Sequence, residues 1–113
     1  MPEVAAPPTA PMEAFLVIAM DIKDDAWLAP YFDTVPDLLA EYGAVWVAAS
    51  RHITRVEGEK PGPVPDRVAI LRFPSRAALD SFFADPRYAP FRAMRLAGSD
   101  ADLFAFESKS EAG

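Results

Sequence analysis

A single histidine, His52, lies in the segment SRHITRVEGE, residues 50–59, together with two arginines. Histidine ordinarily titrates near neutral pH, so His52 could pass a proton to or from a bound substrate. The sequence identifies no acid as its partner, and a strand-end histidine that faces solvent or another subunit is the plainer interpretation. His52 is therefore the first candidate for acid–base catalysis, and both interpretations stay open.

Two arginines near the end of the last predicted helix form a second candidate group. Arg92 and Arg95 are three residues apart, which places them on one helical face, where they could hold a carboxylate or an enolate. The alternative is that both are solvated or pair with nearby acids. Asp21 follows an apolar run and would lie at the rim of a sheet, as a candidate base or as a solvated carboxylate.

Aromatic residues make up 12% of the chain, more than a small core requires. Pockets for small molecules are mainly apolar with few polar groups, so these side chains could line a site for a planar or polyketide-like ligand. Core packing is the alternative role for most of them. Trp46 and Tyr88 carry polar groups and are favoured for the pocket wall. The candidates are Tyr31, Trp46, Phe82, Phe83, Tyr88 and Phe91.

The composition narrows the classes of function. A net charge of −6 over 113 residues disfavours the basic surface that binds nucleic acid. The chain has no cysteine and one histidine, so it offers no disulfide, thiolate nucleophile or histidine-rich metal site, and we expect neither a metal nor a cofactor. The longest apolar run, residues 14–20, is too short to cross a membrane, and no signal-peptide pattern precedes it. We therefore expect a soluble cytoplasmic protein.

The length of the chain is suited to one packed core and not to two. Residues 1–13 combine proline with small side chains and are predicted to be a flexible tail, within which Met12 is a possible start of translation. Residues 14–108 are predicted to form the domain, and residues 109–113 to fray.

Four segments have the β-branched and large apolar residues that are typical of strands: residues 14–22, 44–56, 67–73 and 102–107. In the second segment, regular alternation would place Trp46 and His52 on one face. Residues 58–65 are dense in glycine and proline, which predicts a surface loop.

Two further segments have apolar side chains at spacings of three and four, which predicts amphipathic helices. The first lies within residues 24–42, and Pro36 predicts either a kink in it or a restart capped by Thr34. Ser75 is the predicted cap of the second, and Pro86 ends or restarts it.

The order strand, helix, strand, strand, helix, strand predicts an α+β, ferredoxin-like βαββαβ fold, with an antiparallel four-stranded sheet and helices on one face. Three of these segments are apolar at consecutive positions, over residues 15–20, 68–71 and 103–106, so the face without helices should be covered as well. A second copy, packed sheet on sheet around a two-fold axis, is the simplest cover. We therefore expect a homodimer.

The sequence resembles the domain-of-unknown-function family 1330 (DUF1330), in the dimeric α/β barrel superfamily, over most of residues 15–107. The resemblance rests on a valine-proline step followed by LLAEYG, on the Glu57-Gly58 pair, on FPS at residues 73–75 and on DPRYAPFRAMR at residues 85–95. It implies the ferredoxin-like fold and a ligand between sheet and helices, with Arg51 and Glu57 as candidate binding residues. Arg51 lies two residues from the place of the family's arginine, on the same face of the strand.

Relatives in this superfamily include cofactor-independent monooxygenases, lactone isomerases and polyketide cyclases. The resemblance thus implies a cofactor-free enzyme that moves a proton on a small apolar carbonyl compound, by isomerisation, cyclisation or oxygenation. In this hypothesis His52 moves the proton and Arg92 or Arg95 stabilises the oxyanion. The alternative is a non-catalytic dimeric binding or stress-associated protein that holds a ligand through Trp46 and Tyr88.

Overall fold

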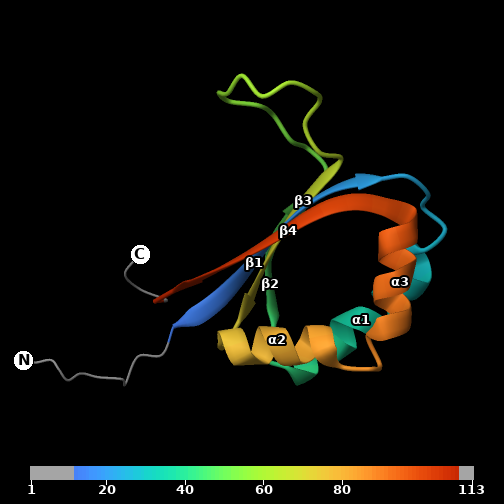
Figure 1. Ribbon diagram of the computed structural model, residues 1–113, viewed down its shortest axis with the longest axis vertical. Helices are drawn as coiled ribbons and strands as arrows, with labels where there is room; N and C mark the ends of the chain where they lie inside the picture. The colour runs from blue at the N-terminus through green and yellow to red at the C-terminus, as the bar shows by residue number, and fades with distance from the viewer. Residues whose placement is uncertain (1–11, 110–113) are drawn as a thin grey trace, which may run out of the picture.

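The computed structural model of the chain describes residues 12–109. The predicted flexible ends, residues 1–13 and 109–113, fall almost wholly outside this range. The described residues form four strands and three helices (Figure 1). Along the chain these are β1 (Glu13–Ile22), α1 (Leu28–Glu41), β2 (Val45–Ser50), β3 (Arg67–Phe73), α2 (Arg76–Ala84), α3 (Ala89–Gly98) and β4 (Ser99–Ser108).

The strands form one antiparallel sheet in the order β2-β3-β1-β4. All three helices lie on the same side of this sheet (Figure 1). The predicted ferredoxin-like α+β fold is therefore confirmed, with the second helical segment divided into α2 and α3 around Pro86. Among residues 12–109, none of the helices combines the length and the hydrophobicity that spanning a bilayer requires.

The helices follow their local sequence signals closely. The Ser75 hydroxyl accepts a 3.1 Å bond from the backbone N–H of Ala78, so the predicted cap of α2 is confirmed. α1 contains Pro36 and is continuous, so the predicted alternative of a restart at Thr34 is wrong. Proline removes one backbone bond, but burial of a regularly spaced apolar face holds the helix on both sides of it. That face consists of Tyr31, Val35, Leu38 and Leu39.

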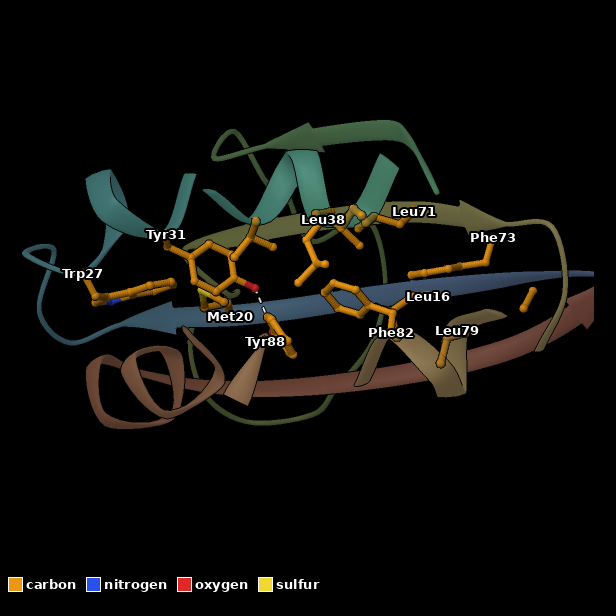
Figure 2. Close-up of a cluster of buried hydrophobic side chains, with 14 residues drawn as sticks. Leu16, Met20, Trp27, Tyr31, Leu38, Leu71, Phe73, Leu79, Phe82 and Tyr88 are labelled. Carbon is orange, nitrogen blue, oxygen red and sulfur yellow. Dashed lines mark hydrogen bonds between the residues drawn. The ribbon is translucent and has the colours of Figure 1, made fainter. Parts of the chain in front are cut away.

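The core lies between the helices and the inner face of the sheet, by which we mean the face that the helices cover. Every second residue of β1 points inward, and Leu16 and Met20 are each 5% exposed. The centroid of the Phe82 ring lies 4.4 Å from that of the Tyr88 ring and 6.0 Å from that of the Phe73 ring. Figure 2 shows these side chains. Tyr88 and Phe73 are almost completely buried, so these aromatic side chains pack the helices onto the sheet.

β2 is shorter than predicted. The strand that we expected over residues 44–56 ends at Ser50, because its neighbour β3 begins only at Arg67 and Ser50 already pairs with Val68. Residues 51–66 have no strand beside them and form a largely exposed loop that projects from the body of the protein (Figure 1).

The alternation of side chains between the two faces of the sheet is interrupted within β2. Its pairing with β3 shifts register between Trp46 and Ala48, which marks a bulge at Val47. Trp46 pairs with the inward-facing Leu71 and therefore faces the helices, whereas Ala48 faces the other way. The prediction that Trp46 and His52 share one face is therefore wrong, because it assumed regular alternation.

The outer face of the sheet, on the side without helices, carries large apolar side chains. Phe104 and Phe106 of β4 are 64% and 51% exposed, and the Phe106 ring stacks on the Phe15 ring with 5.2 Å between centroids. Val17 and Ile70, which pair with each other, continue this surface onto β1 and β3. Exposed apolar surfaces of this kind usually mark a place where another molecule binds.

Candidate functional site

A cavity lies between the inner face of the sheet and the helices. The centres of water-sized molecules can occupy about 40 Å³ of it, and the empty space between its walls, open solvent included, is about 530 Å³. Leu16, Met20 and Leu71 line it from the sheet, and Tyr31 and Phe83 line it from the helices. Its wall is thus mainly apolar, as in sites for small organic ligands.

Two tyrosines and an arginine provide polar groups at this cavity. The hydroxyl groups of Tyr31 and Tyr88 are 2.8 Å apart (Figure 2), and Nε of Arg95 donates a long bond of 3.4 Å to the Tyr88 hydroxyl. Tyr31 and Arg95 line the cavity, and Tyr88 connects them. Because arginine only donates, the Tyr88 oxygen accepts from Arg95, and the Tyr88 proton is free to reach Tyr31.

Arg95 is 6% exposed, and arginines are rarely buried to this degree without a paired acid. Among residues 12–109, no aspartate or glutamate forms an ion pair with it. The Ser99 hydroxyl donates a 2.5 Å bond to the backbone carbonyl of Arg95, which fixes the end of α3 but leaves the guanidinium charge unbalanced. Burying a cation in this way is unfavourable, so a negatively charged oxygen in the cavity would be stabilised.

Tyr31 is a hydrogen-bond donor rather than a base. Burial raises the pKa of Tyr31 far above its usual range, the Tyr88 hydroxyl acts in the same direction, and Arg95 acts in the opposite one. The Tyr31 phenol is therefore neutral at any ordinary pH. Together, the phenol and the guanidinium are suited to stabilise negative charge on a ligand oxygen.

One end of the cavity lies between α1 and the β2 edge of the sheet. Phe32 and Trp46 are 37% and 36% exposed there, with 6.1 Å between their ring centroids. The guanidinium carbon of Arg67 lies 5.4 Å from the centre of the Phe32 ring, a cation–π contact. Sequence reasoning missed Arg67, although alternation from the inward-facing Ala69 and Leu71 places it on the inner face.

Several of the site residues predicted from the sequence come together here. The cavity is lined by Tyr31, Trp46, Phe83 and Arg95. Trp46 reaches it because it pairs with the inward-facing Leu71, and Tyr88 contributes through its hydroxyl bond to Tyr31. Arg92 lies outside the cavity, in a surface groove that Arg95 also lines.

The other predicted site residues lie elsewhere. His52 is exposed in the loop after β2 and lines a shallow hollow on the outer face of the sheet. Asp21 accepts a 3.2 Å bond from the backbone N–H of Asp66 and so holds the end of this loop. Arg51 lines an open polar hollow that also contains Asp66, and Glu57 is exposed in the loop. None of these side chains lines the cavity.

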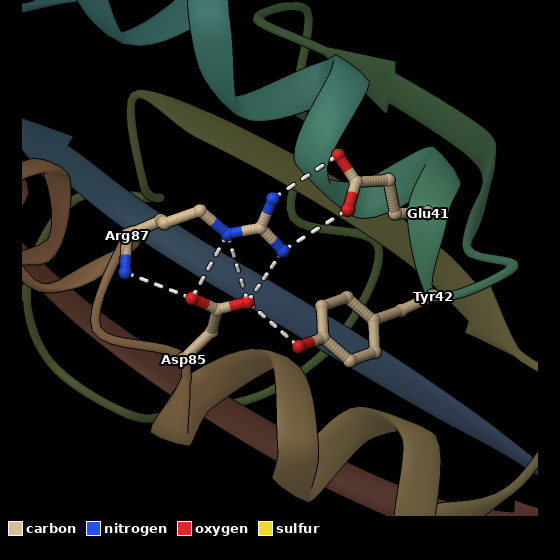
Figure 3. A network of polar contacts seen from close by, with 4 residues as sticks. All are labelled: Glu41, Tyr42, Asp85 and Arg87. Carbon is tan, nitrogen blue, oxygen red and sulfur yellow. Dashed lines mark hydrogen bonds and ion pairs between the residues drawn. The ribbon is translucent and has the colours of Figure 1, made fainter.

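A polar network ties the helices to one another (Figure 3). The Asp85 carboxylate accepts bonds of 2.8 Å from the backbone N–H and from Nη2 of Arg87, and one of 2.7 Å from the Tyr42 hydroxyl. Arg87 also donates a 3.0 Å bond to Glu41 at the end of α1. These bonds hold the pKa of Asp85 well below its usual range, those from the Arg87 side chain most of all. The network fixes the turn that precedes Tyr88 and so helps to position this tyrosine.

Comparisons with known proteins agree with this architecture. A family model described as a domain of unknown function (DUF1330) matches residues 13–108. No curated protein matches the sequence.

Solved structures similar to this chain share its fold at low sequence identity. The RPA0582 protein of Rhodopseudomonas palustris, of unknown function, is 18% identical with a TM-score of 0.74, over 86% of this chain and 82% of its own. SnoaB of Streptomyces nogalater, a cofactor-independent oxygenase, is 16% identical with a TM-score of 0.62, over 88% of this chain and 95% of its own. Identities this low support the shared ferredoxin-like, dimeric α/β barrel type of fold and no detail of the chemistry.

Proposed function

We propose a function for this chain as a member of the DUF1330 family, to which it belongs through its match over residues 13–108. The cavity binds a small, largely apolar carbonyl compound and stabilises negative charge on the carbonyl oxygen. A proton beside the carbonyl is then transferred more readily to a water molecule in the cavity. The resulting reaction is an isomerisation, a cyclisation or an oxygenation, and it uses no cofactor.

The observation that carries this proposal is the buried Arg95, linked to the Tyr31 hydroxyl through Tyr88, at an apolar cavity. A ligand oxygen near both groups would accept charge-assisted hydrogen bonds in a site with little water. These bonds are stronger for an enolate than for the neutral ketone, because the enolate oxygen carries negative charge. Binding would thus lower the pKa of the ligand and favour its carbanion.

SnoaB supports the enzymatic form of this proposal. It is a cofactor-independent oxygenase with a similar fold, so the fold is compatible with chemistry that relies on the substrate itself. In an oxygenation of this kind, the substrate carbanion supplies the electrons that reduce dioxygen. A site that stabilises the carbanion is therefore the main contribution that the protein has to make.

A second candidate function is binding of a ligand without reaction. The described residues that line the cavity include no histidine, aspartate or glutamate, so this subunit offers no ordinary base to a ligand there. His52, which we predicted to move the proton, lines the hollow on the outer face. A ligand that is already ionised, such as an acidic enol, would be held by Arg95 and released unchanged.

The proposed working state is a homodimer. The support is the outer face of the sheet, where Phe104 and Phe106 are more than half exposed next to Phe15. A second copy packed sheet on sheet would remove this apolar surface from water. Native mass spectrometry of gently purified protein should give the dimer mass, and a monomer would contradict this part of the proposal.

Butyrophenone, an apolar aryl ketone with exchangeable hydrogens beside its carbonyl, is a suitable probe of the cavity. Its binding can be followed by tryptophan fluorescence, because Trp27 and Trp46 both line the cavity, and its proton loss by deuterium uptake in heavy water. We expect the wild-type protein to bind the ketone and to accelerate exchange. Arg95→Met should lower the affinity about tenfold and abolish the acceleration. Arg55→Met, on the projecting loop, is the matched control.

The outcomes of this experiment separate the two functions. Binding with accelerated exchange supports the enzyme, and binding without exchange supports the second candidate. Failure of the wild-type protein to bind butyrophenone, or unchanged binding by Arg95→Met, would contradict the proposed site.

A further inference from the structure

A surface groove lies next to the cavity, between β4 and the helices α2 and α3. The centres of water-sized molecules can occupy about 540 Å³ of it, far more than in the cavity. Leu16, Phe83, Arg95 and Leu103 line both the groove and the cavity. These four side chains therefore form the partition between the two spaces, and Phe83 among them is only partly buried.

The groove combines an apolar floor with positive charge. Leu103 and Ala105 of β4 form part of the floor, and the charged lining residues are three arginines and one aspartate. The aspartate, Asp80, is held by Arg76 through a 2.9 Å bond, and Arg76 also lies 3.6 Å from Glu107. Arg76 is thus neutralised by its neighbours.

Arg92 and Arg95 are the arginines of the groove that have no such neighbours. In the part of the chain that the structure describes, neither forms an ion pair. The chain as a whole has a net charge of −6, so a local excess of positive charge is contrary to its average. An apolar surface beside two unpaired guanidinium groups is suited to a ligand with an apolar body and an anionic group.

We propose that the groove is the entrance to the cavity and that the substrate is a carbonyl compound with a carboxylate a few bonds away. This inference rests on the proposed function and adds the class of substrate. Arg95, at the partition, binds the carbonyl oxygen, and Arg92, at the rim, binds the carboxylate. Their spacing of three residues places both side chains on one face of α3, with Cβ atoms about 5–6 Å apart, so one ligand with a carbonyl and a carboxylate separated by two carbon atoms can contact both.

Three ligands with one carbon skeleton test this inference. The acid is 4-oxo-4-phenylbutanoate, the neutral isostere is its amide, and butyrophenone lacks the second group altogether. We expect the wild-type protein to bind the acid about tenfold more tightly than the amide, because a charge-assisted bond replaces a neutral one. Deuterium uptake next to the ketone should be accelerated for all three ligands, since Arg95 binds the carbonyl in each.

Two exposed positions allow variants that keep the core intact. Arg92→Gln should reduce the preference for the acid to about twofold or less, because the acid loses far more affinity than the amide or butyrophenone. Ala105→Trp places a large ring on the groove floor and should weaken or slow the binding of all three ligands. Ala77→Trp, on the exposed side of α2 away from the groove, is its matched control and should change nothing.

The results separate this inference from the function on which it rests. Equal affinities of the wild-type protein for acid and amide, or a preference that Arg92→Gln retains, would overturn the inference while butyrophenone binding upholds the cavity. Unchanged binding by Ala105→Trp would overturn the groove as entrance. If neither butyrophenone nor the acid binds, the inference and the proposed function both fail.

Discussion

The inner and outer faces of the sheet both carry large apolar side chains, but the helices cover only the inner face. Phe73 on the inner face is fully buried beneath the helices, whereas Phe104 on the outer face is 64% exposed. Apolar residues on a strand therefore predict that a face will be covered, but not whether the same chain supplies the cover. On the inner face the cover is incomplete, and the space that it leaves contains Tyr31 and Arg95.

The candidate polar side chains beside the two faces also differ in their burial. Arg95 is buried, and Nε of its guanidinium donates a bond to the Tyr88 hydroxyl, so a ligand meets its charge in a defined position. His52 is exposed in a loop beyond the last paired residue of β2. Both side chains were predicted site residues, and Arg95, which lines the cavity beside the inner face, has the surroundings of a binding site.

The largest expected effect comes from removing one phenylalanine from each face. Phe73→Ala should lower the free energy of unfolding by about 3–5 kcal/mol, because it leaves a cavity in a packed core. Phe104→Ala should change the stability of a subunit by less than about 1 kcal/mol, since its ring already contacts water. Urea unfolding at low protein concentration measures both. Equal losses would show that the outer face is already part of a folded core.

Asp85→Asn tests what keeps the helices on the inner face. Bonds from Arg87 and Tyr42 favour the ionised carboxylate and so lower the pKa of Asp85 in the folded protein. Their full contribution to the stability of the fold is therefore present when the pH is above the ordinary aspartate pKa of about 3.9. This stability is lost as the pH falls further towards the folded-state pKa. The melting temperature of the variant should therefore be well below that of wild type at neutral pH, and the two should converge below about pH 4.

Tyr42→Phe is the milder companion to that change. It removes the 2.7 Å bond to Asp85 and retains the bonds from Arg87, so its melting temperature should lie between those of Asp85→Asn and wild type. A gap between Asp85→Asn and wild type that stays constant from neutral pH to pH 3 would contradict a role for the carboxylate charge.

Arg95→Met separates a binding role from a structural one. Replacing an unpaired buried charge by an apolar side chain of similar length is often neutral or stabilising. We therefore expect the free variant to be as stable as wild type, or more stable by about 1 kcal/mol, although it binds ligand less well. Urea unfolding of wild type, Arg95→Met and the exposed control Arg92→Met measures this difference. A loss of several kcal/mol would mean that Arg95 mainly supports Tyr88 and the core.

Much of the fold could be predicted because its signals are local. The Ser75 cap and the break at Pro86 depend on a few adjacent residues, and the apolar face of α1 depends on regular spacing. β2 was predicted too long, because its end depends on where a distant strand begins, at Arg67. Its bulge at Val47 leaves no mark on the segment VWVAAS. Long-range pairing was thus beyond what the local pattern contains.

The candidate site was predictable in its residue types more than in its geometry. The sequence pointed to both Arg92 and Arg95, and only the packing of α3 shows that one is buried at the cavity and the other exposed at the groove. Tyr31 and Phe83 followed from helical spacing. His52 was predicted from its chemistry alone. The type of a residue does not indicate in which direction its loop leaves the sheet, so the position of His52 could not be predicted.

The smallest effect is expected from His52→Ala. The backbone N–H of His52 donates a hydrogen bond to the Ser50 hydroxyl, and the substitution retains this N–H. We expect butyrophenone affinity and deuterium exchange to change by less than about twofold, as for most exposed residues. A strong loss of exchange with the dimer intact would mean that a partner subunit brings His52 to the cavity. The outer face would then supply the base that the inner face lacks.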